Sequence, residues 1–307
     1  MIPEDKILNF HNVDTLVDEY IDYAKDIDKK KIDFSFDLLY KEIRGLRVQE
    51  LMTVIAGAGI GKSALALNFL MNFVKRTNEL TVLFSLEMST IGIGERIFQI
   101  ELDKFGYEIE SGFVKEEAEF IQECRDLKTS LNNFIIVTDR IEVHKIPDYL
   151  KEIETIKEKK VRLVGIDYIG LMENNLFMKD EYLRTTDNMK ILYAYAKKLD
   201  IAIINLSQTS RADVKGTKEG LSIYSGKGSG EVENSSDFLL TLERIDEPRT
   251  DETDKFAYVE SLNTENHLFD LMRLTIQKNR RGKRVIIYVI FNRKNLRIKE
   301  FEKPPLF

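Results

Sequence analysis

The 307-residue sequence has one cysteine, no excess of positive charge and no long apolar run. With Cys124 alone, the chain cannot build an intramolecular disulfide framework or a cysteine-rich zinc site, which fits a reducing compartment. No apolar stretch approaches the length that spans a bilayer, and the N-terminus lacks the basic and apolar segments of a signal peptide. These absences predict a soluble cytoplasmic protein without a membrane partner.

The charge balance limits how the chain could bind nucleic acid. Its formal net charge is -6 at pH 7, so any such contact has to come from a local basic surface. The length suffices for a full core and is long for one domain, so we expect one main domain with appendages.

Residues 56–63, Ala-Gly-Ala-Gly-Ile-Gly-Lys-Ser, have the spacing of a phosphate-binding P-loop. A strand-like apolar run at 51–55 precedes them and a segment of helical composition at 64–74 follows. Glycines in such a loop let backbone N–H groups face phosphate oxygens at a helix N-terminus. Ala56 replaces the usual first glycine, and a glycine turn in another α/β fold remains the alternative.

The motif predicts that the chain binds a nucleoside triphosphate. Lys62 would reach the β- and γ-phosphates, and the Ser63 hydroxyl would ligate Mg²⁺. The expected nucleotide-binding residues are Gly57, Gly59, Gly61, Lys62 and Ser63.

From residue 50, short apolar segments alternate with amphipathic ones, which is typical of an α/β fold with a mostly parallel sheet between helices. The expected strands are 51–56, 80–86, 134–138, 161–167 and 201–207. The expected helices are 62–75, 91–104, 115–126, 146–159 and 187–199. Three further apolar runs without intervening helices predict an antiparallel C-terminal extension, at 238–242, 271–277 and 285–291.

Other segments depart from this alternation. A separate helix is expected at 12–31, with Asp14 as its N-cap. Residues 173–186 and 212–236 lack apolar periodicity, and 245–270 is charged and polar. Long irregular segments inside a compact domain are more often functional or mobile than structural.

Three polar residues end three of the expected strands, where ligands of α/β sheets bind. Asp167 is the candidate second Mg²⁺ ligand, Glu87 would polarise the attacking water, and Gln208 would sense the γ-phosphate. For either acid alone, a carboxylate that caps the next helix is the alternative. Their combination with a P-loop favours an ATPase.

Several segments resemble successive motifs of the DnaB-type replicative helicases, which are RecA-fold motors. These segments are Ser-Leu-Glu-Met-Ser at 85–89, Ile-Asp-Tyr at 166–168 with Leu171 and Met172, and Leu-Ser-Gln at 206–208 with Ser210 and Arg211. The resemblance extends from about residue 32 to about residue 300. It implies a RecA-like P-loop fold that uses ATP and Mg²⁺. It also implies that Glu87 is the catalytic glutamate, Asp167 the Walker B aspartate and Gln208 the residue that couples the γ-phosphate to DNA-binding loops.

Residues 278–282, Lys-Asn-Arg-Arg-Gly, resemble the family's Lys-Gln-Arg-Asn-Gly segment. The resemblance implies that Lys278 and Arg280 reach the ATP of a neighbouring subunit as sensor and arginine finger. The register is open, since Arg281 could substitute for Arg280, and a basic hairpin turn is the alternative. An arginine supplied in trans implies a ring of subunits, with six as the family's number.

The N-terminal helix resembles in position the linker helix by which this family docks onto an adjacent subunit, although packing on its own domain is the alternative. We accordingly divide the chain into a linker helix at 1–35 and a RecA-like ATPase domain at 36–307. The sequence has only about thirty residues before the resemblance begins, where cellular members carry a helical domain that contacts primase. We therefore expect a motor encoded by a phage, plasmid or mobile element, with a primase or loader protein as candidate partner.

Residues 227–230, Lys-Gly-Ser-Gly, align with the family's DNA-contacting Arg-Glu-Ser-Gly. Backbone N–H groups and lysines of such a loop would bind single-stranded DNA without reading its bases. The expected nucleic-acid residues are Arg211, Lys215, Lys227, Gly228, Ser229 and Gly230.

The sequence as a whole predicts an ATP-dependent, homohexameric DNA helicase that translocates on single-stranded DNA. Two other classes stay open, a recombination ATPase of the RecA or RadA type and a KaiC-like ATPase switch that acts on a protein partner.

Overall fold

The computed structural model describes residues 12–174, 180–209, 229–263 and 266–301. The strands are β1 Lys31–Ile32, β2 Leu46–Arg47, β3 Leu51–Ala56, β4 Leu80–Ser85, β5 Phe134–Val137, β6 Val161–Asp167, β7 Ala202–Gln208, β8 Phe238–Arg244, β9 Phe269–Asn279, β10 Val285–Asn292 and β11 Arg297–Glu300. The α-helices are α1 Val13–Lys25, α2 Ile27–Lys30, α3 Asp37–Ile43, α4 Lys62–Thr77, α5 Thr90–Leu102, α6 Gly106–Val114, α7 Ala118–Ser130, α8 Ile146–Lys157, α9 Glu181–Lys198, α10 Ser229–Asn234 and α11 Thr253–Leu262.

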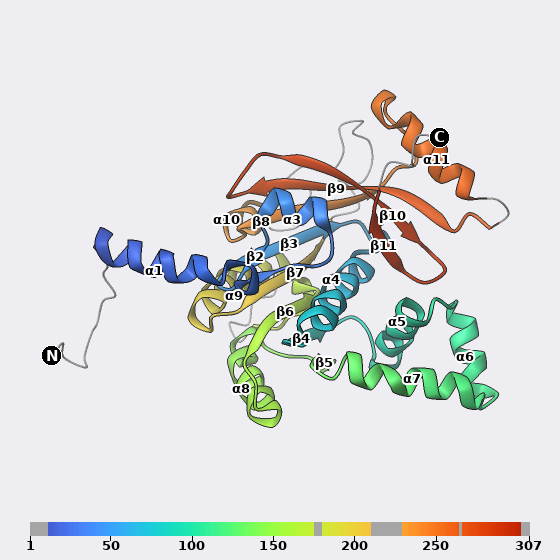
Figure 1. Cartoon of the computed structure of the whole chain (residues 1–307), viewed down its shortest axis with the longest axis horizontal. Helices are drawn as coiled ribbons and strands as arrows, with labels where there is room; N and C mark the ends of the chain where they lie inside the picture. Colours follow the sequence, from blue (N-terminus) through green and yellow to red (C-terminus); the bar gives the residue numbers. More distant parts are fainter. Residues whose placement is uncertain (1–11, 175–179, 210–228, 264–265, 302–307) are drawn as a thin grey trace.

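One large sheet organises the described part of the chain (Figure 1). Its strand order is β11-β10-β9-β8-β3-β7-β6-β4-β5, and the strands from β8 to β5 run parallel. The last three strands of the chain, β9, β10 and β11, add to the β8 edge in antiparallel fashion. The expected α/β fold with a mostly parallel sheet and an antiparallel extension is therefore confirmed.

Strand β3 lies near the middle of this sheet, between β7 and β8, and all six of its residues are buried. Helices α3 and α4 cover one face of the sheet, whereas α8 and α9 cover the other. Because both faces are covered, the central strands read as continuous apolar runs rather than as alternating patterns. Helices α5, α6 and α7 form a lobe beside the sheet (Figure 1), and Cys124 is buried in that lobe.

The C-terminal part of the fold corrects two expectations. Strand β8 pairs parallel with β3, so it belongs to the parallel sheet and not to the antiparallel extension. An apolar run does not reveal the direction of its neighbour, which only tertiary pairing decides. Helix α11 lies between β8 and β9, where no helix was expected. It is short and buries only Val259, with Phe256 and Tyr258 packed partly against the same cluster, so its apolar pattern is too brief to indicate a helix clearly.

The helix assignments need further corrections. The short helices α3 and α6 were not expected, and α9 begins at Glu181, six residues before the expected start. The N-cap of α1 is Asn12 and not Asp14. The Asn12 side chain accepts a hydrogen bond from the Thr15 N–H, and the Thr15 hydroxyl accepts one from the Asn12 N–H, which together form a capping box.

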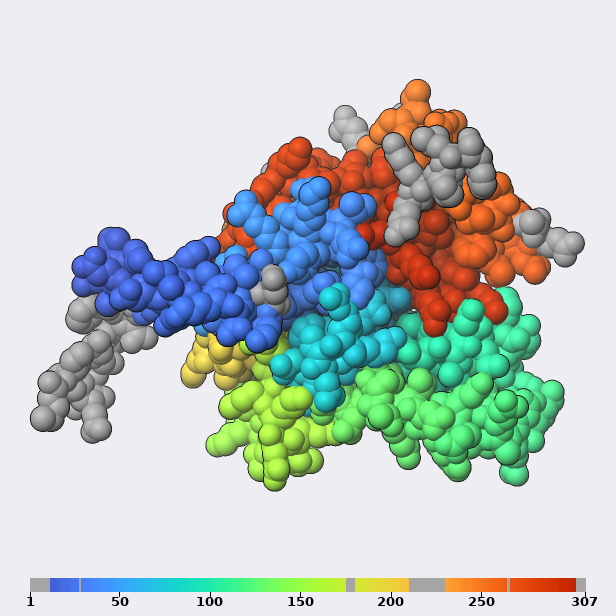
Figure 2. Space-filling view, viewed as in Figure 1, coloured from blue at the N-terminus to red at the C-terminus, as the bar shows by residue number. Residues whose placement is uncertain are grey.

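The N-terminal segment contains two helices where a single helix at 12–31 was expected. Helix α1 ends at Lys25 and is followed by the short helix α2. Ile32 and Phe34 are buried in the main core, so the main body begins at β1. Helix α1 itself buries none of its residues and projects from the body (Figure 2).

No helix among the described residues combines the length and the apolar character that a membrane crossing requires.

A buried ion pair fixes α11 and the turn before it to the antiparallel strands. The Glu252 carboxylate is fully buried and accepts two hydrogen bonds of 2.5 Å from the Arg273 guanidinium. It also accepts from the Arg249 N–H and from the Tyr288 hydroxyl. Burial opposes the charged form, but these hydrogen bonds and the charge of Arg273 prevail and lower the pKa of Glu252 to about 2. Burial of the Tyr288 hydroxyl and the nearby Glu252 charge raise the pKa of Tyr288 to about 12.

We predict that Glu252→Gln lowers the free energy of unfolding by about 3 kcal/mol at pH 7, because it leaves the buried Arg273 charge uncompensated. The folded-state pKa of Glu252 lies below its ordinary value of 4.5, so its contribution is complete above pH 4.5 and is lost as pH falls toward 2. Urea unfolding at several pH values should show the difference between wild type and variant shrinking over that range. The exposed Glu247→Gln is the control, and a difference that does not change with pH would contradict this account.

Candidate nucleotide-binding site

The expected P-loop joins the end of β3 to the start of α4. Strand β3 ends at Ala56, and α4 begins at Lys62 with Gly61 as its N-cap. Gly59 and Gly61 have φ values of 75° and 102°, which residues with a Cβ rarely adopt. The first N–H groups of α4 have no partner within the helix and are available to an anion. The local backbone is therefore that of a phosphate cradle.

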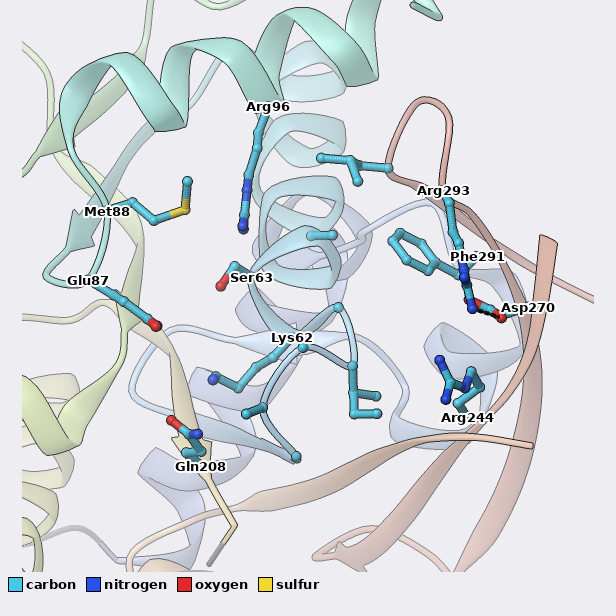
Figure 3. A pocket seen from close by; sticks show the side chains of 17 residues that line it. Lys62, Ser63, Glu87, Met88, Arg96, Gln208, Arg244, Asp270, Phe291 and Arg293 are labelled. Atoms are coloured by element: carbon cyan, nitrogen blue, oxygen red, sulfur yellow. Dashed lines mark hydrogen bonds and ion pairs between the residues drawn. The ribbon is translucent and has the colours of Figure 1, made fainter. Parts of the chain in front are cut away.

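The sheet register brings the three expected strand-end residues to the P-loop. Gln208 ends β7 and is the register partner of Ala56, whereas Asp167 ends β6 and is the partner of Ser85 on β4. The Leu86 N–H donates to the Asp167 carbonyl at 2.8 Å, so the chain that leads to Glu87 is fixed beside β6. Glu87 and Gln208 both line a cavity of about 490 Å³ together with Lys62 (Figure 3).

Asp167 is the most deeply buried acid of this group, with 2% of its surface exposed. Burial raises the pKa of its carboxyl group, although a hydrogen bond with Ser63 and the nearby charge of Lys62 act in the opposite direction. Its Oδ1 atom is buried without a hydrogen-bond partner among the residues that the structure describes. An unpaired buried carboxylate oxygen is costly, which indicates a site that is completed by a ligand.

The donor set suits Mg²⁺. A hydroxyl from Ser63 and a carboxylate from Asp167 are hard oxygen ligands, and Mg²⁺ takes one or two protein ligands together with phosphate oxygens and water. No cluster of three or more His, Cys, Asp or Glu residues that could hold a metal occurs in the described ranges. The residues therefore fit an ion that is held jointly by protein and nucleotide.

The cavity has a second wall that sequence reasoning missed. Its further lining residues are Met88, Arg96, Arg244, Asp270, Phe291, Arg293 and Leu296. Arg96 points from α5 toward Ser63 (Figure 3), and only its place on the expected helix after Glu87 could have suggested it. Asp270 pairs with Arg293 through two contacts of 2.6 and 2.7 Å. Asp270 and Phe291 belong to the C-terminal strands β9 and β10, and no local pattern in the sequence indicates that these strands fold against the P-loop.

Lys278 and Arg280 lie far from this cavity in their own chain. Asp270, near the start of β9, lines the cavity, whereas Arg280 follows the other end of the same strand. Ten residues of extended strand span roughly 30 Å at about 3.3 Å per residue. Neither Lys278 nor Arg280 therefore reaches this cavity within its own chain.

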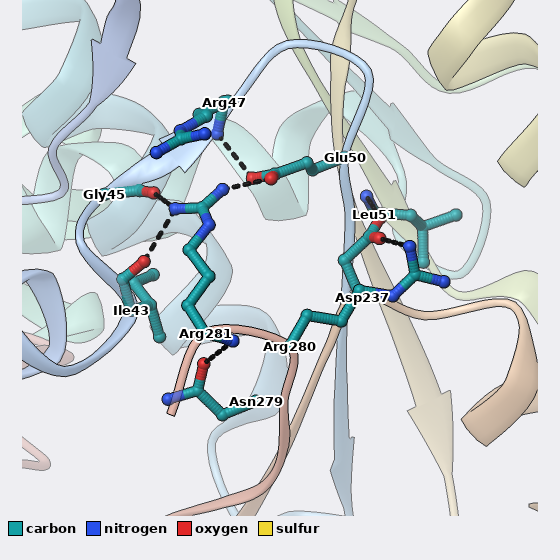
Figure 4. A network of polar contacts seen from close by, with 9 residues as sticks. All are labelled: Ile43, Gly45, Arg47, Glu50, Leu51, Asp237, Asn279, Arg280 and Arg281. Atoms are coloured by element: carbon teal, nitrogen blue, oxygen red, sulfur yellow. Dashed lines mark hydrogen bonds and ion pairs between the residues drawn. The ribbon is translucent and has the colours of Figure 1, made fainter. Parts of the chain in front are cut away.

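Arg280 and Arg281 differ in their contacts and in how much of each side chain is exposed (Figure 4). Arg281 donates 2.7 Å hydrogen bonds to the carbonyls of Ile43 and Gly45 and pairs with Glu50. Its side chain is only 12% exposed, whereas the Arg280 side chain is 47% exposed and pairs with Asp237 at 2.8 Å. Arg281 thus holds the α3–β2 turn, whereas Arg280 keeps about half of its side-chain surface exposed.

Most of the expected nucleic-acid residues cannot be placed. Arg211, Lys215, Lys227 and Gly228 lie outside the described residues. Ser229 and Gly230 begin helix α10, where Gly230 is exposed.

Comparison with known proteins gives consistent relatives. The model of the DnaB-like helicase C terminal domain matches residues 32–300. The replicative DNA helicase DnaB of Geobacillus stearothermophilus is 26% identical over 222 residues, 72% of this chain and 48% of that protein. The probable plasmid replicative DNA helicase of Chlamydia muridarum is 26% identical over 192 residues, 62% of this chain and 42% of that protein. The chain spans about half the length of the curated relatives it matches.

Solved structures agree on the fold. A DnaB-like replicative helicase, solved in a study of its interactions with primase, superposes with a TM-score of 0.74 at 19% identity over 96% of this chain and 68% of that one. A solved ATPase domain superposes with a TM-score of 0.78 at 19% identity over 96% of this chain and 100% of the other. With the RecA-like fold in place and the family model matched over most of its length, the chain belongs to the DnaB-like helicase C terminal domain family.

Proposed function

We propose that the chain is an ATP-dependent DNA helicase motor that translocates on single-stranded DNA as a homohexameric ring. The observation that carries the proposal is the division of the catalytic residues between two ends of the sheet. The P-loop, Glu87, Asp167 and Gln208 gather at one end, whereas Arg280 is exposed at the other. Each site is then complete only where two subunits meet.

Each residue of the cavity has a role that follows from its position. The amides at Gly59 and Gly61 and the Lys62 ammonium bind the phosphates, and Ser63 with Asp167 holds Mg²⁺, which neutralises phosphate charge when bound. The exposed Glu87 orients and deprotonates the attacking water. Gln208 senses the γ-phosphate from the end of β7.

The second wall of the cavity suits the remainder of the nucleotide. The Phe291 ring lies 3.8 Å from the position that a Cβ on Gly61 would take, so it borders the P-loop directly. An aromatic ring offers a base a stacking surface, and the nearby Arg244 can add a cation–π contact. On the phosphate side, Arg96 contributes a positive charge from the same subunit.

Helix α1 supports assembly into a ring. Its apolar residues recur at helical spacing and are all exposed, namely Val13, Leu16, Val17, Tyr20 and Ile21. A 13-residue helix is marginally stable by itself in water, so this face needs a partner. We assign that partner to the main domain of the adjacent subunit, with α1 as the linker between neighbours.

The remaining assignments follow from the family. Arg211, Lys215, Lys227 and the segment 228–230 would contact single-stranded DNA in the ring channel. A primase or loader protein is the candidate external partner, and the lone buried Cys124 suits a reducing cytoplasm.

We predict that Lys62→Ala abolishes unwinding of a forked DNA with Mg²⁺ and ATP, and lowers ATP hydrolysis roughly 100-fold or more, because the phosphates lose their main cation. A strand-displacement assay with a labelled fork measures the loss. Lys75→Ala, which breaks a pair with Glu101 at the far end of α4, is the control. Unwinding that persists in the Lys62 variant refutes the proposal, and hydrolysis that ignores single-stranded DNA favours a protein-directed switch.

A mixing experiment tests whether Arg280 acts in trans. Alone, Arg280→Ala and Lys62→Ala should each keep only a small residual rate of ATP hydrolysis. Co-assembled, they should recover activity, because an intact P-loop from one subunit meets an intact Arg280 from the other. Mixing Arg280→Ala with the Lys62→Ala, Arg280→Ala double variant is the control and should give no recovery. Equal rates from the first mixture and the control would place the completing arginine elsewhere.

Substituting the apolar face of α1 should weaken ring assembly. Leu16→Ser with Tyr20→Ser removes two side chains that each contribute about 1.5 to 3 kcal/mol when buried, so association should fall at least tenfold. Sedimentation velocity with a non-hydrolysable ATP analogue measures the shift from rings to monomers. Asp18→Ser, on the same helix, is the matched control. Unchanged assembly of the double variant would show that α1 does not bind a second copy.

A further inference from the structure

Lys278 and Arg280 are both held, within their own subunit, by the end of α10 and the connection from it to β8. The Lys278 ammonium donates to the Glu233 carbonyl at 2.6 Å. The Arg280 guanidinium pairs with the Asp237 carboxylate at 2.8 Å, and the Arg280 N–H donates to the Asp237 carbonyl at 3.3 Å (Figure 4). Residues 233–237 therefore contact the two side chains that the proposed function assigns to a neighbour's nucleotide.

Asp237 is a rigid anchor within this connection. Its side chain is buried, and its Oδ2 atom accepts a 2.8 Å hydrogen bond from the Leu51 N–H at the start of β3. Its own N–H donates to the Leu51 carbonyl at 2.8 Å. One residue earlier, the hydroxyls of Ser236 and Thr53 share a hydrogen bond of 2.8 Å. These contacts fix the Asp237 carboxylate to the strand that carries the P-loop at its other end.

Arg280, in contrast, has a long and half-exposed side chain. Its guanidinium offers five N–H donors in a planar fork, and Asp237 engages one edge of it. The guanidinium carbon also lies 5.7 Å from the centre of the Tyr193 ring. A free arginine side chain would lose considerable rotamer freedom on meeting a phosphate, and a guanidinium that is already held loses less.

We propose that Asp237 is a positioning residue for the trans arginine. It holds one edge of the Arg280 guanidinium on the fixed frame of β3, so that the exposed edge is presented to the nucleotide of the adjacent subunit. This inference rests on the proposed function and adds the residue that preorganises its completing charge. It also explains why a buried carboxylate stands opposite a half-exposed arginine at this subunit edge.

Asp237→Asn tests the inference because the amide oxygen can still accept from the Leu51 N–H while the charge is lost. We expect the kcat of DNA-stimulated ATP hydrolysis to fall about tenfold, since Arg280 then has to be ordered during the reaction. The KM for ATP should stay within about twofold, because binding belongs to the P-loop of the other subunit. Unchanged kcat in a folded Asp237→Asn ring overturns the proposal.

A double-mutant cycle separates positioning from a general structural role. If Asp237 acts through Arg280, adding Asp237→Asn to Arg280→Ala should lower kcat no further. If the two substitutions instead lower kcat by the product of their separate factors, Asp237 acts independently of Arg280 and the inference is overturned. If Arg280→Ala keeps full activity, the role of Arg280 in the proposed function is wrong. If Arg280→Ala loses most of its activity but Asp237→Asn keeps full activity, only the positioning role of Asp237 is wrong.

Arg280→Lys gives a second test that does not depend on how well Asp237→Asn folds. The residue is half exposed, so the variant should fold, and its ammonium keeps the charge without the two-edged fork. We expect a loss of kcat comparable to that of Asp237→Asn. Full activity of Arg280→Lys would show that a held guanidinium edge is not needed. Thermal unfolding and ring assembly of every variant are measured alongside.

Discussion

The placement of β3 in the interior of the sheet is the constraint on which the rest of the molecule depends. Its carboxyl end opens into the P-loop, and parallel pairing with β7 brings Gln208 to the same edge. Its amino end hydrogen-bonds Asp237, which in turn holds Arg280. One buried strand of six residues thus fixes both the nucleotide cradle and the residue that we assign to the next subunit's nucleotide.

Separating the two halves of the site has a physical consequence for the proposed motor. A strand does not bend back on itself, so Arg280 at one end of β9 cannot serve the cavity at the other end. Hydrolysis then depends on assembly, and each site can report on its neighbour. Arg281 contributes differently, because its contacts with Ile43, Gly45 and Glu50 tie the hairpin to the body and keep the adjacent Arg280 in place.

Two buried carboxylates show how this fold uses charge. Glu252 is surrounded by donors, and its pKa is lowered, so it serves as a structural clamp on the antiparallel strands. Asp167 is buried, one of its oxygens has no hydrogen-bond partner in the described part of the chain, and its pKa is raised. The difference arises from their partners and not from their depth. A buried carboxylate with one oxygen left unbonded beside a P-loop indicates a ligand site, which is the role that the proposed function gives to Asp167.

The sequence by itself determined the local chemistry. The P-loop could be predicted because its glycines and lysine are close together in the chain, and Glu87, Asp167 and Gln208 were predicted as candidates because each follows an apolar run. The parallel direction of β8, the helix α11 and the cavity wall that contains Phe291 depended on contacts between distant segments.

The difference between Arg280 and Arg281, on which the proposal relies, likewise comes only from the tertiary structure. The two are identical side chains one residue apart, and burial against the α3–β2 turn distinguishes them. Motifs encode which groups are present, whereas long-range packing decides which of them are free to act.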